Sequence, residues 1–426
     1  MEWYKRGTLV VSGWRARSAL RNMKFWSSDT SLHLAGMAIG LAEETRHFKF
    51  IGTTGTGKST AITELLDGAL ERGDRAIIAD PDGGYLARFH DRNRGDVILN
   101  PFELRSVKWN PFAEIHTPYD VEQLASGLIP STEDASSREW RGYARTFLSA
   151  IAQRCNQQGK ADAAELWRLL AIASSTELRK VVAGTPAQPF LDADNARMFG
   201  SIRSVTGSAV AALAYIQSQK ASSFSVRDWV RSGDGSLFIP YQANQIAALR
   251  SIIATWVRLA IFEAMNRPEE DRHLWFVIDE LDALGAIDGL KDALARLRKF
   301  GGRCIIGFQS LAQVSGTYGP DAQTIIENCG NTLILRCSGS DNGGTSQFAS
   351  RLIGEREIVR RQTSRGRDRE GAYLFKGGRR STNITTQHVT EAAVMPSELE
   401  QLPDLTGYLK TASSRAWRRV RLARPR

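Results

Sequence analysis

The segment GTTGTGKS, residues 52–59, constrains the fold of this chain more than any other part of its sequence. It fits the pattern G-x-x-x-x-G-K-[ST], an apolar run precedes it from Phe48, and a helical pattern follows it to Glu71. Glycines permit the backbone angles that turn successive N–H groups inward, and the helix adds its positive amino-terminal end. Strand, loop and helix together predict a phosphate-binding loop.

This loop suits a nucleoside triphosphate, so the predicted cofactors are ATP and Mg²⁺. We expect Lys58 to reach the β- and γ-phosphates and the Ser59 hydroxyl to ligate Mg²⁺. The alternative is a glycine- and threonine-rich turn that holds no ligand. The predicted nucleotide-binding residues are Gly52, Thr53, Thr54, Gly55, Thr56, Gly57, Lys58, Ser59 and Thr60.

A second apolar strand, in LWFVIDELDAL, ends in two acids. In open α/β sheets the ligand groups gather at the carboxyl ends of the strands. Asp279 is therefore predicted to act on Mg²⁺ from the outer coordination sphere, and Glu280 to be the base that polarises the attacking water. The alternative is that both acids merely close the strand.

Two further residues are candidates for the same reaction. Gln309, at the end of the strand CIIGFQS, could sense the γ-phosphate and pass the difference to the adjoining loop, or it could only cap the next helix. Phosphoryl transfer also needs a cation, which a neighbouring subunit can supply. We expect Arg298 in that role, with Arg296 in reserve, although basic residues at a helix end also serve the helix dipole.

The rest of the chain predicts an α/β protein with one interruption. Strand and helix patterns alternate up to residue 105 and again from residue 226, whereas residues 106–225 show helical patterns only. We therefore predict a discontinuous nucleotide-binding domain, residues 1–105 and 226–426, with an all-helical domain of residues 106–225 inserted in it. Lys58 and Asp279 are 221 residues apart, which requires such an insertion.

Charge and cysteine content limit the possible partners and setting. The net charge is +10, and residues 351–426 hold 17 Lys and Arg against 8 Asp and Glu, which suggests a polyanionic partner or a solvated basic tail. We expect a loop or hairpin in its basic segment, residues 360–383. The four cysteines form no C-x-x-C pair, so we expect a reducing compartment, and no run reaches the ~18 apolar residues of a membrane helix.

Several motifs together resemble a known family. Besides the phosphate loop they are VIDELDAL, IIGFQSLAQ, ADPDGG, WNPF and PSELEQLPDLTGYL, and they span nearly the whole chain. The set is similar to the type IV secretion coupling proteins of bacterial conjugation. One departure is Asp82 in ADPDGG, where many relatives carry lysine, so we assign that loop no catalytic role.

The resemblance implies a RecA-like nucleotide-binding domain with a mixed, mostly parallel sheet and an inserted all-helical domain. It further implies a homohexamer with ATP sites between subunits, DNA-dependent ATPase activity, and recruitment of a relaxase–DNA complex to a secretion channel. Family members usually begin with a membrane anchor, which this chain lacks. We therefore expect either the soluble portion of a protein at the cytoplasmic face of the bacterial inner membrane or an anchor in another polypeptide.

DNA could contact the helical insertion. Arg138, Arg141 and Arg145 share one face of a predicted helix beside an aromatic face, which suits binding along a nucleic-acid backbone; the alternative is an ordinary amphipathic helix. No base-reading module is evident, so we expect sequence-tolerant binding. Two rival functions remain: a chromosome translocase of the FtsK type, and a docking adaptor that binds ATP but moves nothing.

Overall fold

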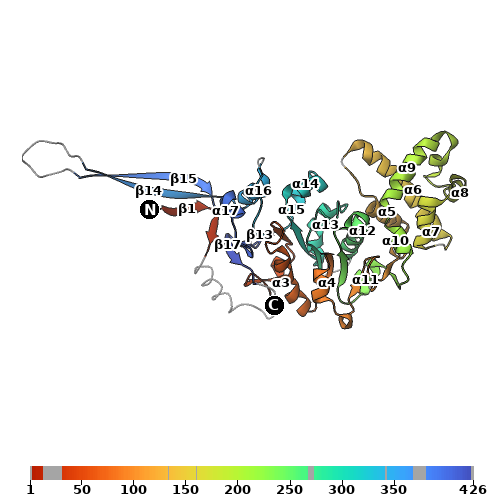
Figure 1. The fold of residues 1–426 in the computed structure, drawn as a ribbon, viewed down its shortest axis with the longest axis horizontal. Helices are drawn as coiled ribbons and strands as arrows, with labels where there is room; N and C mark the ends of the chain where they lie inside the picture. The colour runs from red at the N-terminus through yellow and green to blue at the C-terminus, as the bar shows by residue number, and fades with distance from the viewer. Residues whose placement is uncertain are drawn as a thin grey trace, which may run out of the picture.

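A large mixed sheet forms the centre of the molecule (Figure 1). The computed structural model describes residues 2–12, 31–132, 134–159, 161–266, 273–340, 343–367 and 380–423. Within these ranges the sheet has ten strands in the order β2 (Leu9–Val11), β17 (Ala416–Arg421), β16 (Thr406–Lys410), β13 (Asn331–Ile334), β5 (Phe48–Ile51), β12 (Arg303–Phe308), β11 (Leu274–Ile278), β6 (Arg75–Pro81), β10 (Leu237–Tyr241) and β7 (Val97–Ile98).

The strands from β13 to β7 are all parallel, and β16 and β17 add antiparallel pairs at one side. Alternate residues of β6 enter different cores: Ile77 and Ala79 pack on one face of the sheet, Ala76 and Ile78 on the other. This period of two is what a strand buried on both faces produces. The predicted α/β class with a mixed, mostly parallel sheet is confirmed.

Helices cover both faces of this sheet. One face carries α3 (Lys58–Glu71) and α4 (Gly84–Phe89), next to the short hairpin of β3 (Leu32–Leu34) and β4 (Met37–Ile39). The other face carries α12 (Ile246–Ala264), α13 (Leu290–Leu297), α14 (Leu311–Tyr318), α15 (Asp321–Glu327) and α16 (Gly344–Ile353). The remaining short helices outside the insertion are α2 (Leu41–Glu44), α11 (Val226–Ser232) and α17 (Pro396–Glu400).

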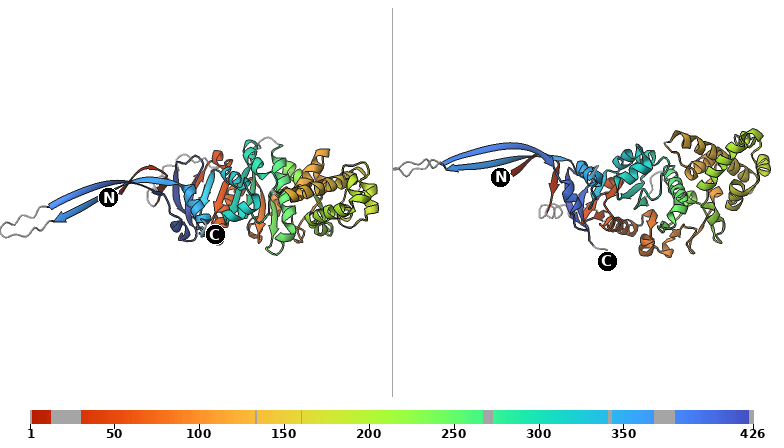
Figure 2. Two further views of the ribbon diagram at one scale, coloured as in Figure 1. Left: turned by 90° about the horizontal axis from the view of Figure 1, so that it is seen from above. Right: turned by 45° about the horizontal axis from the view of Figure 1, so that its top comes forward.

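An all-helical region lies at one end of the molecule, away from the strands β16 and β17 (Figures 1 and 2). Its helices are α5 (Pro118–Leu128), α6 (Ala135–Gln157), α7 (Ala163–Trp167) with a π-helical continuation (Arg168–Ile172), α8 (Ser175–Val181), α9 (Ala196–Ala209) and α10 (Leu213–Gln217). Two short parallel strands, β8 (Lys108–Trp109) and β9 (Ser223–Phe224), pair where the chain enters and leaves it. They lie just inside the predicted limits of residues 106–225.

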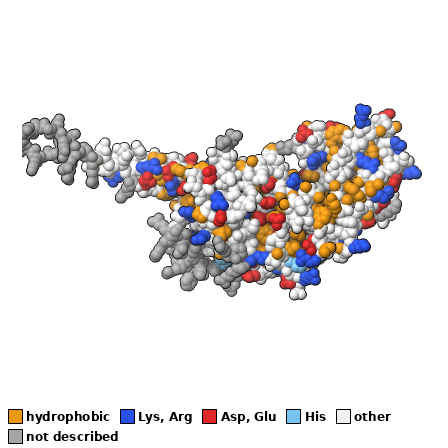
Figure 3. Space-filling view, in the orientation of Figure 1, with side chains coloured by type: hydrophobic (Ala, Val, Ile, Leu, Met, Phe, Trp, Pro, Cys, Tyr) orange, Lys and Arg blue, Asp and Glu red, His pale blue; other side chains and the backbone are white. Residues whose placement is uncertain are grey.

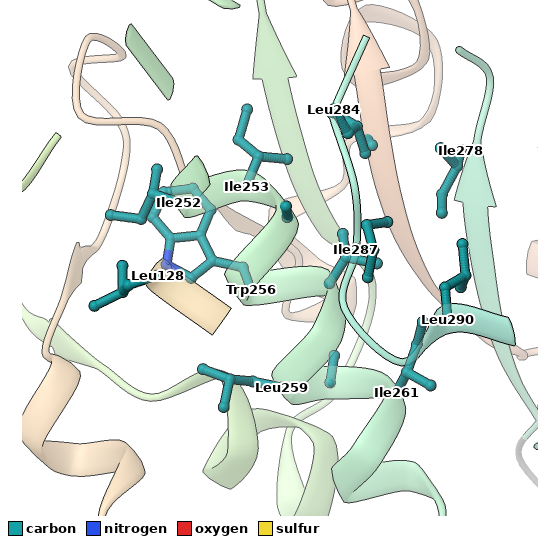
Figure 4. Close-up of a cluster of buried hydrophobic side chains, with 14 of the residues drawn as sticks. Leu128, Ile252, Ile253, Trp256, Leu259, Ile261, Ile278, Leu284, Ile287 and Leu290 are labelled. Carbon is teal, nitrogen blue, oxygen red and sulfur yellow. The ribbon is translucent and has the colours of Figure 1, made fainter. Parts of the chain in front are cut away.

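Helix α12 joins the helical region to the sheet (Figure 4). Trp256, which is 1% exposed, lies near Leu128 of α5, while Ile261 lies on the side of α12 that faces Leu290. Full burial of such side chains stabilises the fold by about 1.5–3 kcal/mol each. The two helices come so close that a Cβ at Gly127 would lie 2.8 Å from the Thr255 side chain. The insertion is therefore packed directly on the nucleotide-binding domain.

The described parts of the basic segment, residues 360–367 and 380–383, belong to a long hairpin. Strands β14 (Glu355–Arg367) and β15 (Arg380–Ala392) pair in antiparallel register, and β1 (Glu2–Gly7) pairs with β14. The three strands form a stalk that projects from the sheet end of the molecule (Figure 1). The expected hairpin is confirmed; residues 368–379 lie outside the described ranges. All four cysteines are buried and free.

Candidate functional site

The phosphate-loop motif lies between β5 and α3, as the spacing predicts. Gly55 and Gly57 have φ angles of 75° and 115°, which L side chains rarely adopt. A Cβ at Gly57 would also lie 2.9 Å from the Leu405 side chain, and one at Gly52 would lie 2.9 Å from Thr56 and Leu335. The first N–H groups of α3 have no partner within the helix, so they are free to face an anion.

Lys58 lies under this loop. It is 6% exposed, and its Nζ donates a hydrogen bond to the carbonyl oxygen of Gly52 at 2.7 Å. Burial lowers the pKa of the Lys58 ammonium, and the negative charges of Asp279 and Glu280 oppose this effect. The structure therefore brings the predicted phosphate-binding lysine, Lys58, close to the two predicted acids, Asp279 and Glu280.

The Asp279 carboxylate is the centre of that site. Its Oδ2 accepts hydrogen bonds from the Ser59 hydroxyl at 2.6 Å and from the Tyr85 hydroxyl at 2.8 Å. Its Oδ1 is buried and has no hydrogen-bond partner among the described residues. A hydroxyl and a carboxylate are oxygen ligands of the kind that Mg²⁺ prefers. These residues fit the predicted role in holding Mg²⁺, directly for Ser59 and through water for Asp279.

Gln309 connects the phosphate loop to the second acid. Its Oε1 accepts a hydrogen bond from the Thr54 hydroxyl at 2.8 Å, and its Nε2 donates to Glu280 Oε1. The amino-terminal cap of α14 is Ser310, so capping by Gln309 is not what the structure contains. Gln309 therefore links the position of Thr54 in the phosphate loop to the position of Glu280.

Arg298 lies at the opposite edge of the sheet from Lys58. It begins the 3₁₀ turn Arg298–Phe300, just before β12 starts. Burial lowers the pKa of His47, which precedes β5, to about 4, and the nearby charge of Arg298 adds to this effect. The phosphate loop follows the carboxyl end of β5, and the strand's four residues separate the two edges by about 13 Å at ~3.3 Å per residue. Arg298 and Arg296 are both exposed. The position of Arg298 before β12 keeps it away from the phosphate loop of its own subunit.

The three predicted DNA-binding arginines of α6 contact the backbone that follows α5. Arg138 donates to the Thr132 carbonyl oxygen, Arg141 to that of Pro130, and Arg145 to that of Ile129 at 2.6 Å. Orphan carbonyls at a helix end are ordinarily satisfied by such donors. Figure 3 shows Lys and Arg side chains dispersed over the helical end of this face, with hydrophobic side chains between them.

Tyr85 is a site residue that the sequence reasoning missed. It follows the DPDGG loop, in which Asp82 and Gly83 both adopt left-handed angles, with φ of 61° and 73°. This tight turn starts α4 close to the end of β6, and Asp80 accepts hydrogen bonds from the backbone N–H groups of Tyr85 and Leu86. The sequence analysis assigned this loop no catalytic role, but the loop brings Tyr85 to Asp279 and so contributes to the site.

Comparison with known proteins agrees with this geometry. The family model of the type IV secretion-system coupling protein DNA-binding domain matches residues 31–423. The chain belongs to this family. The coupling protein TraD of Escherichia coli (strain K12) is 30% identical in an alignment 407 residues long, which covers 92% of this chain and 54% of TraD. The chain thus spans about half the length of that coupling protein.

Solved coupling-protein structures share the whole fold. The conjugative coupling protein TrwBdeltaN70 superposes with a TM-score of 0.87 and 32% identity, covering 99% of this chain and 94% of that one. TrwB with the ATP analogue ADPNP gives 0.85 and 31%, covering 100% and 95%. TrwB has also been solved with ADP and Mg²⁺ (TM-score 0.84, 32% identity, covering 99% and 94%). Among the described residues of this coupling protein, no helix has the length and apolarity needed to cross a membrane.

Proposed function

We propose that this chain is the ATPase portion of a conjugative coupling protein that binds ATP with Mg²⁺ and uses hydrolysis to move DNA. The observation that carries the proposal is the Ser59–Asp279 contact beneath a phosphate loop whose lysine lies within the influence of both acids. TrwB, which shares the fold, binds ADPNP, and it binds ADP with Mg²⁺. Bound Mg²⁺ would supply positive charge against the triphosphate.

The residues of this site divide the work. Lys58 and the loop N–H groups hold the phosphates, Ser59 and Asp279 hold Mg²⁺, and Glu280 orients and polarises the attacking water. Gln309 contacts both the phosphate loop and Glu280, which supports its role as the residue that reports on the γ-phosphate. Gly52, Thr53, Thr54, Gly55, Thr56, Gly57 and Thr60 complete the nucleotide-binding set.

The site is completed by a second copy of the chain. Because Arg298 is exposed at the far edge of the sheet, it would act only on the nucleotide of a neighbouring subunit. In a closed ring, here a homohexamer, the edge of the sheet that carries Arg298 would face the nucleotide site of the next subunit. In that ring the protein would contact DNA without sequence preference, at the cytoplasmic face of the inner membrane, and deliver a relaxase–DNA complex to the secretion channel.

The test is steady-state ATP hydrolysis at low salt, with and without single- and double-stranded DNA, over a range of protein concentrations. We expect DNA to stimulate turnover and the specific activity to rise with protein concentration, since the site needs two subunits. Lys58→Ala is the control for contaminating ATPase and should abolish turnover. Turnover that is independent of DNA and of protein concentration would instead support an ATP-switched docking adaptor.

A roadblock assay separates a translocase from a docking adaptor. A translocase of either the conjugative or the FtsK type should displace a protein bound tightly to DNA, and only in the presence of hydrolysable ATP. An adaptor should leave the roadblock in place. Displacement by the Lys58→Ala protein would contradict the proposal.

A further inference from the structure

The carboxylate of Asp279 is held from one side only. Both of its donors, Ser59 and Tyr85, bond to the same oxygen, Oδ2. The other oxygen, Oδ1, is buried without a hydrogen-bond partner within the described part of the chain, although the residue is only 3% exposed. A buried carboxylate oxygen without a donor is costly, so the two hydrogen bonds to Oδ2 are the contacts that hold this carboxylate in place.

Tyr85 is itself firmly fixed. Its side chain is 4% exposed and packs in the apolar core between the sheet and α3. Its backbone N–H donates to Asp80 Oδ1 at 3.2 Å, and the next N–H, of Leu86, donates to Asp80 Oδ2 at 2.7 Å. The phenol therefore reaches Asp279 from a rigid position, whereas the carboxylate could rotate about its own bond.

We propose that Tyr85 is a positioning residue of the metal site: its hydroxyl fixes the rotation of the Asp279 carboxylate so that Oδ2 stays beside the hydroxyl of Ser59, the predicted metal ligand. This inference rests on the proposed binding of ATP with Mg²⁺. The Ser59 hydroxyl donates its proton to Asp279 and keeps its lone pairs for the metal. Tyr85 adds the second donor that a single serine hydroxyl cannot provide, as the outer partners of metal ligands commonly do.

Tyr85→Phe tests the proposal because it removes the hydroxyl and keeps the packed ring. The measurement is the affinity for a fluorescent ADP while Mg²⁺ is titrated into protein first freed of metal with chelator. We expect the Mg²⁺ concentration for half-maximal effect to rise about tenfold, the usual size for loss of an outer partner of a metal ligand. The affinity for the fluorescent ADP in chelator should stay unchanged, since the Tyr85 hydroxyl contacts Asp279 and the Ser59 hydroxyl and not the N–H groups that hold the phosphates.

Tyr318→Phe is the matched control. Tyr318 is also buried, at 8% exposed, and its hydroxyl donates to the Gly285 carbonyl oxygen at 3.2 Å, on the opposite face of the sheet from Tyr85. We expect a comparable shift in the midpoint of thermal unfolding for the two variants. Only Tyr85→Phe should shift the Mg²⁺ titration.

The outcomes are distinct. If wild type and Tyr85→Phe show the same Mg²⁺ dependence, the hydroxyl only supports packing and the inference is wrong. If Tyr85→Phe loses affinity equally with and without Mg²⁺, the residue acts on the nucleotide loop and the inference is again wrong. If wild-type protein fails to bind the fluorescent ADP under any condition, the proposed function itself fails, which the other two results do not imply.

Discussion

The carboxyl edge of the sheet and the helical insertion use polar side chains in opposite ways. At the edge, Asp279 is buried with one oxygen left without a partner in the described structure, and Lys58 donates only to carbonyl oxygens of its own loop. In the insertion, Arg141 and Arg145 are bound to carbonyls at the end of α5. The first arrangement leaves interactions for a ligand; the second completes the protein itself. The following changes test this difference, from the largest expected effect to the smallest.

Arg298→Ala should lower ATP hydrolysis by about 10³-fold or more, the contribution of an arginine supplied in trans. Because the side chain lies at the far edge of its own sheet, the affinity of a subunit for nucleotide should not change. The decisive measurement mixes Arg298→Ala with Lys58→Ala protein. Each is inactive alone, and a mixed ring should regain activity wherever an intact loop meets an intact arginine. No recovery in a mixture shown to form mixed rings would rule out the trans role, and Arg296→Ala is the matched comparison.

Glu280→Gln should lower hydrolysis by about 10²- to 10⁴-fold, because an amide cannot act as a general base. The change keeps a side chain of the same shape within reach of Gln309. Binding of a fluorescent ADP with Mg²⁺ should therefore be retained. If binding and turnover fell together, Glu280 would be holding the loop and not acting on water.

Glu114→Ala should destabilise the junction between the insertion and the sheet domain. This carboxylate is 0% exposed and accepts hydrogen bonds from Trp109 Nε1 at 2.8 Å and from the backbone N–H of Val226 at 2.7 Å. Leaving such donors unpaired should lower the free energy of unfolding by about 3 kcal/mol, measured by denaturant titration. Glu139→Ala, on the exposed face of α6, is the control and should change stability little. Equal effects would mean that the junction is not tightly coupled to folding.

Arg145→Ala and Arg138→Ala separate structural from DNA-binding arginines. Arg145 is partly buried, so its loss should lower the free energy of unfolding by about 1–2 kcal/mol without changing DNA affinity. Arg138 is exposed, and its loss should weaken DNA binding uniformly across sequences and reduce the salt dependence by about one charge. Filter binding at several salt concentrations measures the DNA affinity and its salt dependence, and denaturant titration measures the free energy of unfolding. A larger loss of DNA affinity for Arg145→Ala would reverse the assignment.

The sequence determined the fold class and most of the nucleotide site by itself. A glycine at positive φ, a lysine at a helix start and acids at a strand end are local requirements, so Lys58, Ser59 and Asp279 could be named from spacing. Parallel strands bring their carboxyl ends to one edge of the sheet, and this is where Gln309 contacts Thr54 and Glu280. The all-helical insertion could also be predicted from the sequence, because the spacing of apolar residues in a helix is a local pattern.

Only the tertiary structure decided which polar groups meet across strands. Tyr85 reaches Asp279 because two left-handed residues turn the chain sharply after β6, and nothing in DPDGGY indicates that turn's direction. Arg145 donates a hydrogen bond to the carbonyl oxygen of Ile129, 16 residues earlier in the chain, and a helical wheel cannot reveal this contact. Local patterns set the conformation of a segment, whereas hydrogen bonds between distant side chains depend on how the segments pack.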